Sequence, residues 1–342
     1  MDLKVQGSIG GMTRWNLRLP IIARKHIDYT ETIGSSFKMP IRALMLAMVA
    51  VVSGCASWEQ QQALYLASER GDYLTVKRLL DHGTSPDFQV NDGGHFKSPL
   101  FVAAKGGHQT IVILMAERGA NVNFQDWVTG RTVLMVAAAS GDHECVDYLC
   151  SKGADPNMKG EHGETALMYA AFCGAVNCLD RLLKAGAHVD DWASEFWTAD
   201  RLCVEIPGTA LTWASRNGHK EAAEKLLNGG ADPNGAPRGS WSPYFFPGSS
   251  RMAFASVEES PLMYAAQRND IPMAECLLKH GASVDLRAPA TGFTALIWAA
   301  QKNNLSMVRL IIQHGADPQI KDSRGFGPLH YASLDSHAAF SN

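Results

Sequence analysis

The stretch TALMYAAFCGAVNCLDRLLKAGA, residues 165–187, decides the fold of this chain. It holds two short segments rich in apolar residues, with Gly174 between them and Gly186 after the second. Glycine enters the left-handed backbone region without a steric penalty, so it suits a sharp turn between two helices and the cap that ends a helix. The stretch therefore predicts two short helices joined by a tight turn.

The same pattern recurs along the chain with a period near 33 residues. Its copies are QALYLAS (62–68), SPLFVAA (98–104), TVLMVAA (132–138), TALMYAA (165–171), TALTWAS (209–215), SPLMYAA (260–266), TALIWAA (294–300) and GPLHYAS (327–333). Successive copies start 36, 34, 33, 44, 51, 34 and 33 residues apart. In the first seven copies a Gly or Asn follows three residues after the segment, and a Gly lies twelve residues further on. Such a fixed period is typical of a repeat solenoid.

One unit of this size cannot bury its apolar face alone, so neighbouring units must stack. We expect one buried ladder from the first helices, formed by Leu64, Leu100, Leu134, Leu167, Leu211, Leu262, Leu296 and Leu329. We expect a second ladder from the second helices, formed by Leu79, Leu114, Leu149, Leu182, Leu226, Leu277 and Ile311. The aromatic residues that follow two positions after the first-helix leucine are expected to pack as scaffold.

These copies resemble the ankyrin repeat, whose motif reads T-P-L-H-x-A, and the resemblance covers nearly all of residues 57–342. It implies an all-α ankyrin-repeat solenoid of seven full repeats and a truncated eighth. Each full repeat would be a helix-turn-helix unit with a hairpin finger. Most copies replace the motif histidine by residues such as Met168, which exchanges a polar contact for packing.

Composition and charge limit the classes of partner. The chain has 342 residues, of which 46% are hydrophobic and 19% charged, so it can bury a core. Residues 56–342 carry 24 Lys and Arg against 31 Asp and Glu. Because nucleic-acid binding needs a basic surface, this mildly acidic body argues against a nucleic-acid partner.

The stretch RALMLAMVAVVSGCAS, residues 42–57, is unlike the rest of the chain. A membrane-spanning helix needs about 20 apolar residues, and the apolar run here has ten. This shorter run fits the apolar region of a secretory signal. The segment Val52-Ser53-Gly54-Cys55 resembles the lipobox of bacterial lipoproteins, in which the cysteine is acylated and becomes the new N-terminus. The alternative is a buried apolar segment with an incidental cysteine.

The predicted organisation follows from this resemblance. Residues 1–38 are interpreted as an upstream extension, residues 39–54 as a lipoprotein signal peptide, and residues 55–342 as the ankyrin-repeat domain. Cys55 is the predicted lipidation site. The resemblance implies a periplasmic location with a lipid anchor, in the outer membrane because no Asp follows the cysteine.

Reactive side chains give no candidate catalytic or metal site. Most of the 12 histidines fall at fixed positions of the repeat, and equivalent positions lie about 10 Å apart, too far to share a metal ion. Cys145 and Cys150 point to different sides of one helix. Cys173 and Cys178 flank the turn at Gly174, and a disulfide between them stays open at this point. We expect no enzyme activity, no cofactor and no small-molecule substrate.

Two insertions interrupt the period, at residues 190–207 and 235–260. Both follow a second helix, and they belong to nearby junctions. Exposed aromatic residues in adaptable loops are typical of protein-binding hot spots. The predicted partner-binding residues are Trp192, Phe196, Trp197, Trp241, Tyr244, Phe245 and Phe246. The alternative is that both loops fold back and cover the stack.

The sequence thus predicts a non-enzymatic module that binds another protein through its fingers and first-helix face, anchored by lipid in a bacterial envelope. Two alternatives remain open. One is an immunity-type protein that neutralises an envelope-acting toxin. The other is a cytosolic or host-directed ankyrin effector, which requires that the apolar run is not a signal.

Overall fold

The computed structural model describes residues 3–7, 15–19, 58–92, 95–126, 129–193, 196–197, 203–204, 207–235 and 259–339. The chain divides into two compact units, residues 1–56 and residues 57–342. In the first unit, β1 (Leu3–Gly7) and β2 (Trp15–Leu19) form an antiparallel pair in which Val5 is opposite Leu17. The predicted leader and Cys55 lie outside the described residues.

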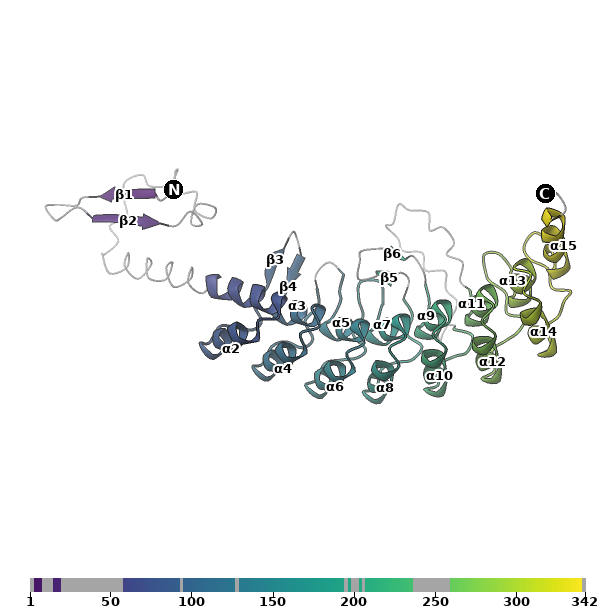
Figure 1. Cartoon of the computed structure of the whole chain (residues 1–342), viewed down its shortest axis with the longest axis horizontal. Coiled ribbons are helices and arrows are strands. Elements are labelled where there is room, and N and C mark those ends of the chain that lie inside the picture. The colour runs from purple at the N-terminus through teal and green to yellow at the C-terminus, as the bar shows by residue number, and fades with distance from the viewer. Residues whose placement is uncertain are drawn as a thin grey trace, which may run out of the picture. The chain divides into compact units, whose positions relative to one another are not determined.

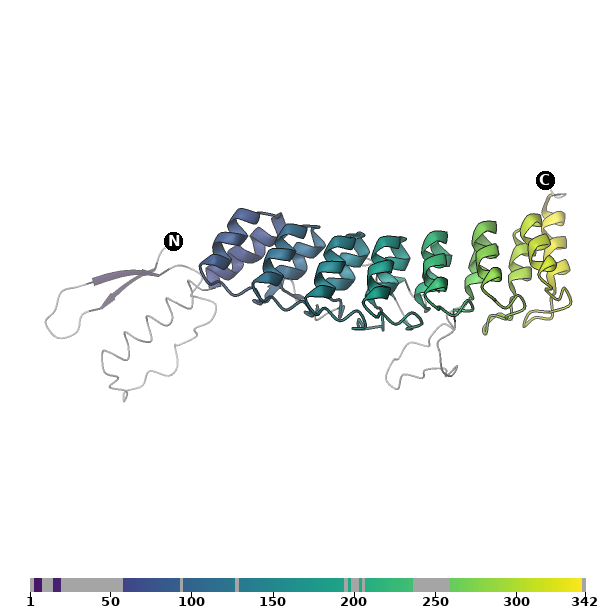
Figure 2. The same cartoon turned by 90° about the horizontal axis from the view of Figure 1, so that it is seen from below.

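The second unit is a stack of helix pairs in two layers (Figure 1). The inner layer consists of a helix over 58–70 followed by α3 (Pro99–Lys105), α5 (Val133–Ser140), α7 (Ala166–Cys173), α9 (Ala210–Asn217), α11 (Pro261–Arg268), α13 (Ala295–Gln301) and α15 (Pro328–Ala339). The outer layer consists of α2 (Tyr73–Asp81), α4 (Gln109–Glu117), α6 (His143–Ser151), α8 (Val176–Lys184), α10 (Lys220–Asn228), α12 (Ile271–Lys279) and α14 (Leu305–Gln313). Figure 2 shows the pairs as successive rungs. The predicted seven helix pairs and single final helix are confirmed.

Local sequence signals start and end the helices. Thr165 caps α7, because its hydroxyl accepts a hydrogen bond from the Met168 N–H at 3.4 Å. Ser98, Thr132, Thr209, Ser260 and Thr294 cap α3, α5, α9, α11 and α13 in the same way. Gly174 ends α7 with φ of 69°, and Asn269 ends α11 with φ of 54°. A Thr or Ser cap and a left-handed end satisfy backbone groups that the helix leaves unpaired.

Both predicted ladders form the core, with three corrections. The first-helix leucines from Leu64 to Leu296 are at most 1% exposed. Leu329 is 78% exposed, because no outer helix packs behind α15 within the described chain. In the second ladder Met115, 0% exposed, takes the central position that was assigned to Leu114, which is itself buried beside it. Leu79 is only half-buried.

A ladder of side chains joins each repeat to the next. In the third repeat, Asn157 accepts a hydrogen bond from the His188 N–H at 2.8 Å and donates to the Gly186 carbonyl at 3.1 Å. The same position in other repeats accepts a backbone N–H from the following repeat, in the pairs Asp87 with Asn121, Asn123 with Asp155, Asp190 with Asp232, Asn234 with Ser283, and Asp285 with Asp317. This junction ladder is continuous across both insertions, so the stack accommodates them without a break.

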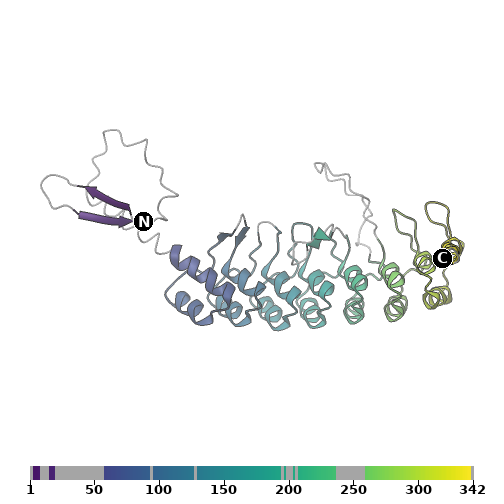
Figure 3. The same cartoon turned by 45° about the horizontal axis from the view of Figure 1, so that its top comes forward.

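The connections between repeats project on one side of the stack as fingers (Figure 3). One finger contains the antiparallel pair β3 (Val90–Asp92) and β4 (His95–Lys97). The insertion at 190–207 contains β5 (Phe196–Trp197) and β6 (Cys203–Val204), and a bridge between Ala193 and Gly208 closes its base. Both insertions fall between an outer helix and the next inner helix, as the spacing predicts. No helix in the described ranges is long and apolar enough to cross a membrane.

Candidate functional site

The predicted partner-binding residues fall in the two insertions. Trp192 is half-buried, and its carbonyl oxygen lies beside Gly163 of the preceding finger. Phe196 and Trp197 form β5 and pair with Val204 and Cys203. The side chains of β5 lie outside the described part of the chain, as do Trp241, Tyr244, Phe245 and Phe246. Their role in binding therefore stays a prediction.

The inner-helix face carries a row of aromatic residues from α7 to α15. Four members are buried, namely Tyr169, Trp213, Tyr264 and Tyr331, and Trp298 is half-buried. The prediction that these residues pack as scaffold is confirmed. Phe293 packs edge-on against Trp298, with ring centroids 5.0 Å apart.

Arginines lie over three of these rings. The guanidinium of Arg131 is 5.1 Å from the ring centre of Tyr169, and that of Arg216 is 5.8 Å from Tyr264. Arg324 lies 5.8 Å from the ring centre of Tyr331. A cation over an aromatic face is attracted by the ring quadrupole, so these arginines are held at the inner face of the stack.

Two buried glutamates occupy the same face. Glu164 and Glu259 each stand directly before the cap residue of an inner helix, and their exposed fractions are 0% and 9%. One Glu164 oxygen accepts from the His162 N–H at 2.9 Å, whereas Oε1 has no hydrogen-bond partner. Burial raises the pKa of the Glu164 carboxyl, and hydrogen bonds from the local backbone oppose that rise.

Glu259 has closer partners. Gln267 Nε2 donates to its Oε2. Burial raises the pKa of Glu259, while Gln267, the charge of Arg216 and the indole of Trp298 act in the opposite direction. The hydrogen bond to Gln267 ties Glu259 to α11, the helix that it precedes. Neither glutamate was predicted from the sequence. The one available signal was an acid at the position before the Thr or Ser cap.

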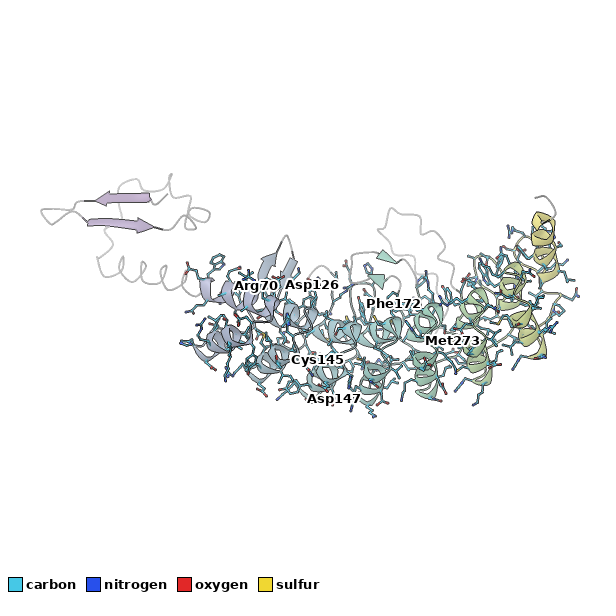
Figure 4. The ribbon with its side chains drawn as sticks, viewed as in Figure 1. Arg70, Asp126, Cys145, Asp147, Phe172 and Met273 are labelled. Carbon is cyan, nitrogen blue, oxygen red and sulfur yellow. The ribbon has the colours of Figure 1, made fainter. Side chains whose placement is uncertain are left out.

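On the outer-helix face, several charges form ion pairs across repeats. Arg118 Nη1 lies 2.7 Å from Asp81 Oδ1, and Lys225 Nζ lies 3.0 Å from Asp180 Oδ1. A recess between α4, α6 and α8 is also internally paired, since Gln109 Nε2 donates to Glu144 Oε2 at 2.8 Å. Figure 4 shows Asp147 on this outward side. Such exposed ion pairs add little stability.

Histidines and cysteines take structural places. His108 Nε2 donates to the Glu69 carbonyl at 3.1 Å, and His219 Nε2 donates to the Phe172 carbonyl at 3.0 Å. These bonds tie the second repeat to the first and the fifth repeat to the fourth. Within the described ranges, no group of three His, Cys, Asp or Glu side chains could hold a metal ion.

Five cysteines are free thiols, namely Cys145, Cys150, Cys173, Cys178 and Cys276. This includes Cys173 and Cys178, the pair for which a disulfide was left open. Cys145 is 2% exposed between the helix layers (Figure 4), and burial raises its pKa to about 12. Cys145 and Cys178 are therefore small packing residues rather than reactive nucleophiles.

The family comparison agrees with this geometry. The family model "Ankyrin repeats (3 copies)" matches residues 43–126, 64–160, 124–192, 161–237 and 251–322. The chain belongs to the ankyrin repeat family. The first match begins at residue 43, inside the segment that the sequence analysis assigns to a signal peptide.

Curated relatives share part of the repeat array. The ankyrin repeat and KH domain-containing protein mask-1 of Caenorhabditis elegans is 31% identical over 116 residues, which cover 33% of this chain and 4% of that protein. The ankyrin repeat and SAM domain-containing protein 6 of Mus musculus is 35% identical over 100 residues, which cover 29% of this chain and 11% of that protein. Palmitoyltransferase AKR1 of Lachancea kluyveri is 28% identical over 183 residues, which cover 52% of this chain and 23% of that protein. This ankyrin chain thus spans less than a quarter of each relative.

Solved structures of ankyrin repeat domains resemble the chain over most of its length. The human ASB11 domain has a TM-score of 0.53 at 24% identity and covers 69% of this chain and 92% of its own. The Bcl-3 domain has a TM-score of 0.52 at 26% identity, and the match covers 70% of this chain and 95% of the Bcl-3 chain. The likeness establishes the ankyrin fold, which is a scaffold for binding proteins.

Proposed function

We propose that the chain is a non-enzymatic module that binds another protein through its inner-helix face and finger loops. The observation that carries this proposal is the contrast between the two faces. Along the inner face three arginines lie over aromatic rings and two glutamates are buried, whereas several charges of the outer face pair with one another across repeats. The rings are buried, but Arg131 and Arg216 are only partly buried and Arg324 is exposed. Arginine is one of the residue types that dominate protein-binding hot spots.

The position of the insertions supports the same face. The first insertion, residues 190–207, comes shortly before α9, and a bridge between Ala193 and Gly208 closes its base; the second insertion, residues 235–260, comes directly before α11. The two inner helices that follow carry Arg216 and Tyr264, which contact each other across repeats. A partner seated on α9 and α11 would therefore meet both insertions.

Affinity capture from an envelope extract tests this proposal. We expect the chain to retain a specific partner, and the double variant Trp197→Ala with Phe245→Ala to lose it while the far-UV circular dichroism stays unchanged. The control is Glu224→Ala on the exposed side of α10. Equal capture by the double variant and the parent would refute binding through the insertions.

We further propose that the chain is exported and anchored by acyl chains on Cys55. The support is the apolar run of residues 43–52 followed by the lipobox-like segment ending at Cys55. Several acyl chains, at about 0.8 kcal/mol per buried methylene, hold such a protein firmly in one leaflet. Residues 56 and 57 after the cysteine are Ala and Ser, which favours the outer membrane.

Metabolic labelling with radioactive palmitate tests the anchor. We expect label in the parent chain and none in Cys55→Ala, with the label recovered in the outer-membrane fraction. Label that persists in Cys55→Ala would exclude Cys55 as the lipidation site, and an unlabelled parent chain would exclude the anchor.

A further inference from the structure

Basic side chains gather on the second half of the inner face, from α9 to α15. Three stand at the ends of inner helices, and three stand in the fingers that precede α13 and α15. They are Arg216, Arg268 and Lys302 at the helix ends, and Arg287, Lys321 and Arg324 in the fingers. These six residues are called the basic inner surface below. All except the half-buried Arg216 are exposed, and Arg287 Nη2 donates to the Lys321 carbonyl at 3.0 Å, so the two fingers touch.

The aromatic row joins the later part of this surface. Phe293 packs against Trp298 with ring centroids 5.0 Å apart, and against Tyr331 with centroids 5.3 Å apart. The guanidinium of Arg324 lies 5.8 Å from the ring centre of Tyr331. Arg324 therefore borders the same strip of rings that includes Trp298 on α13.

The earlier part meets this strip at Glu259. The charge of Arg216 and a hydrogen bond from Trp298 both act to lower the pKa of Glu259, so both side chains lie beside one carboxyl. Arg268 reaches back to the end of α9, because its Nη2 would lie 2.8 Å from a Cβ added at Gly218. The cations of α9, α11 and the last finger thus belong to one surface.

The acids of these repeats do not neutralise this surface. Within residues 208–235 and 259–333, Glu259 and Asp322 are only 9% and 5% exposed, and Asp322 Oδ2 is paired with Arg324 Nε at 3.3 Å. The other acids lie on outer helices, at the cap of α12 or in the junction turns, and they are Glu221, Glu224, Glu275, Asp270, Asp232, Asp285 and Asp317. The four exposed cations other than Arg324 form no ion pair with an acid of these two ranges.

The third and fourth repeats lack this charge. The last two positions of α5 and α7 hold Ala139, Ser140, Phe172 and Cys173, whereas the same positions of α9 and α11 include Arg216 and Arg268. The basic inner surface therefore begins at α9. It lies on both sides of the second insertion in the chain, since that insertion connects α10 to α11.

We propose that the basic inner surface binds an extended acidic segment of the partner protein. This inference rests on the proposed protein-binding function and names the chemistry of the partner. Packed helices lie about 8–10 Å apart, so the cations repeat at about that interval. In a polyproline II segment every third residue lies on one face, about 9 Å apart, so carboxylates at every third position would meet the cations of successive repeats.

A protein segment fits this surface better than a nucleic acid. The first insertion, residues 190–207, precedes α9 and holds five acids and one Arg. Glu161 is exposed on the finger before α7. A long polyanion that continued from α9 toward α7 would meet these acids, whereas a short acidic segment ends before them.

Fluorescence anisotropy with the full-length chain tests the inference. The probe is a fluorescein-labelled peptide of four Glu-Pro-Pro units, and the neutral reference is the same peptide with Gln in place of Glu. An oligothymidylate of similar length is the nucleic-acid probe. We expect the Glu peptide to bind about tenfold more tightly than the Gln peptide, and added sodium chloride to reduce that difference.

Matched charge variants locate the binding. Arg268→Gln with Lys302→Gln is expected to weaken binding of the Glu peptide about fivefold. The control is Lys279→Gln with Arg309→Gln, which removes one exposed Lys and one exposed Arg from the outer helices α12 and α14. We expect this control to stay within about twofold of the parent, and both variants to keep the far-UV circular dichroism of the parent.

Three results would overturn the inference. Equal binding of the Glu and Gln peptides would show that carboxylates are not recognised. Equal losses in the two double variants would show that net charge, rather than the inner face, attracts the peptide. Tighter binding of the oligothymidylate, lost in Arg268→Gln with Lys302→Gln, would assign the surface to nucleic acid.

Affinity capture with the same variants separates this inference from the proposed function. A partner that is lost by the insertion variant but retained by Arg268→Gln with Lys302→Gln would refute the acidic segment and leave the proposed function standing. A chain that binds the Glu peptide as expected but retains no protein would refute the proposed function alone.

Discussion

Replacing Asn157 by alanine is expected to weaken one junction of the solenoid. The side chain accepts from the His188 N–H at 2.8 Å and donates to the Gly186 carbonyl at 3.1 Å, so it joins the third repeat to the fourth. A hydrogen bond contributes a net 0.5–1.5 kcal/mol, and the junction is exposed enough for water to replace part of the loss. The two bonds together predict a loss of about 2 kcal/mol in the free energy of unfolding.

Urea denaturation followed by far-UV circular dichroism measures this loss. Because solenoid stability is the sum of repeat and interface terms, hydrogen exchange should also locate the weakening near residues 155–190. The control is Asn177→Ala, since Asn177 is exposed on α8, and its effect should stay within about 0.5 kcal/mol. An Asn157→Ala effect no larger than that of the control would refute the energetic role of the junction ladder.

Three further predictions concern the core, the turns and a buried acid. Leu167→Ala, at a position 1% exposed, should cost about 3 kcal/mol or more and lower the urea midpoint. Gly174→Ala should lower the free energy of unfolding more than Gly153→Ala in the same assay. Both glycines have positive φ, but only a Cβ at position 174 would lie 2.7 Å from His219 Nδ1. Equal losses in the two variants would contradict this reasoning. Burial raises the pKa of Glu164 in the folded state above its ordinary value of 4.5. The protonated carboxyl therefore favours the folded state at low pH, and this contribution to stability is lost as the pH rises from 4.5 through the raised pKa. Glu164→Gln should therefore gain stability relative to the parent as pH rises, and a pH-independent difference in urea titrations would exclude the effect.

The repeat architecture could be predicted from the sequence because its signals are local. A Thr or Ser cap, an apolar segment of seven or eight residues and a Gly or Asn with positive φ act within one unit, and the period repeats them. Thr165 and Gly174 each have one backbone role that their own residue type supports. The insertions are visible for the same reason, because they interrupt a known spacing.

Other features depend on residues that are far apart in the sequence, so only the tertiary structure decided them. Leu329 matches the motif of Leu167, yet it is exposed because nothing described packs behind the last helix. Glu164 and Glu259 are acids next to the finger loops, yet they are only 0% and 9% exposed in the folded stack.

One physical reason separates the features that the sequence determines from those that stacking of the repeats determines. Backbone conformation at caps and turns is set by each residue and its near neighbours, so the amino-acid sequence by itself determined the helix pairs and their period. Burial, charge pairing and the junction ladder are set by the adjacent repeat. The bond between Asn157 and His188 spans 31 residues, and it exists only once two repeats have stacked.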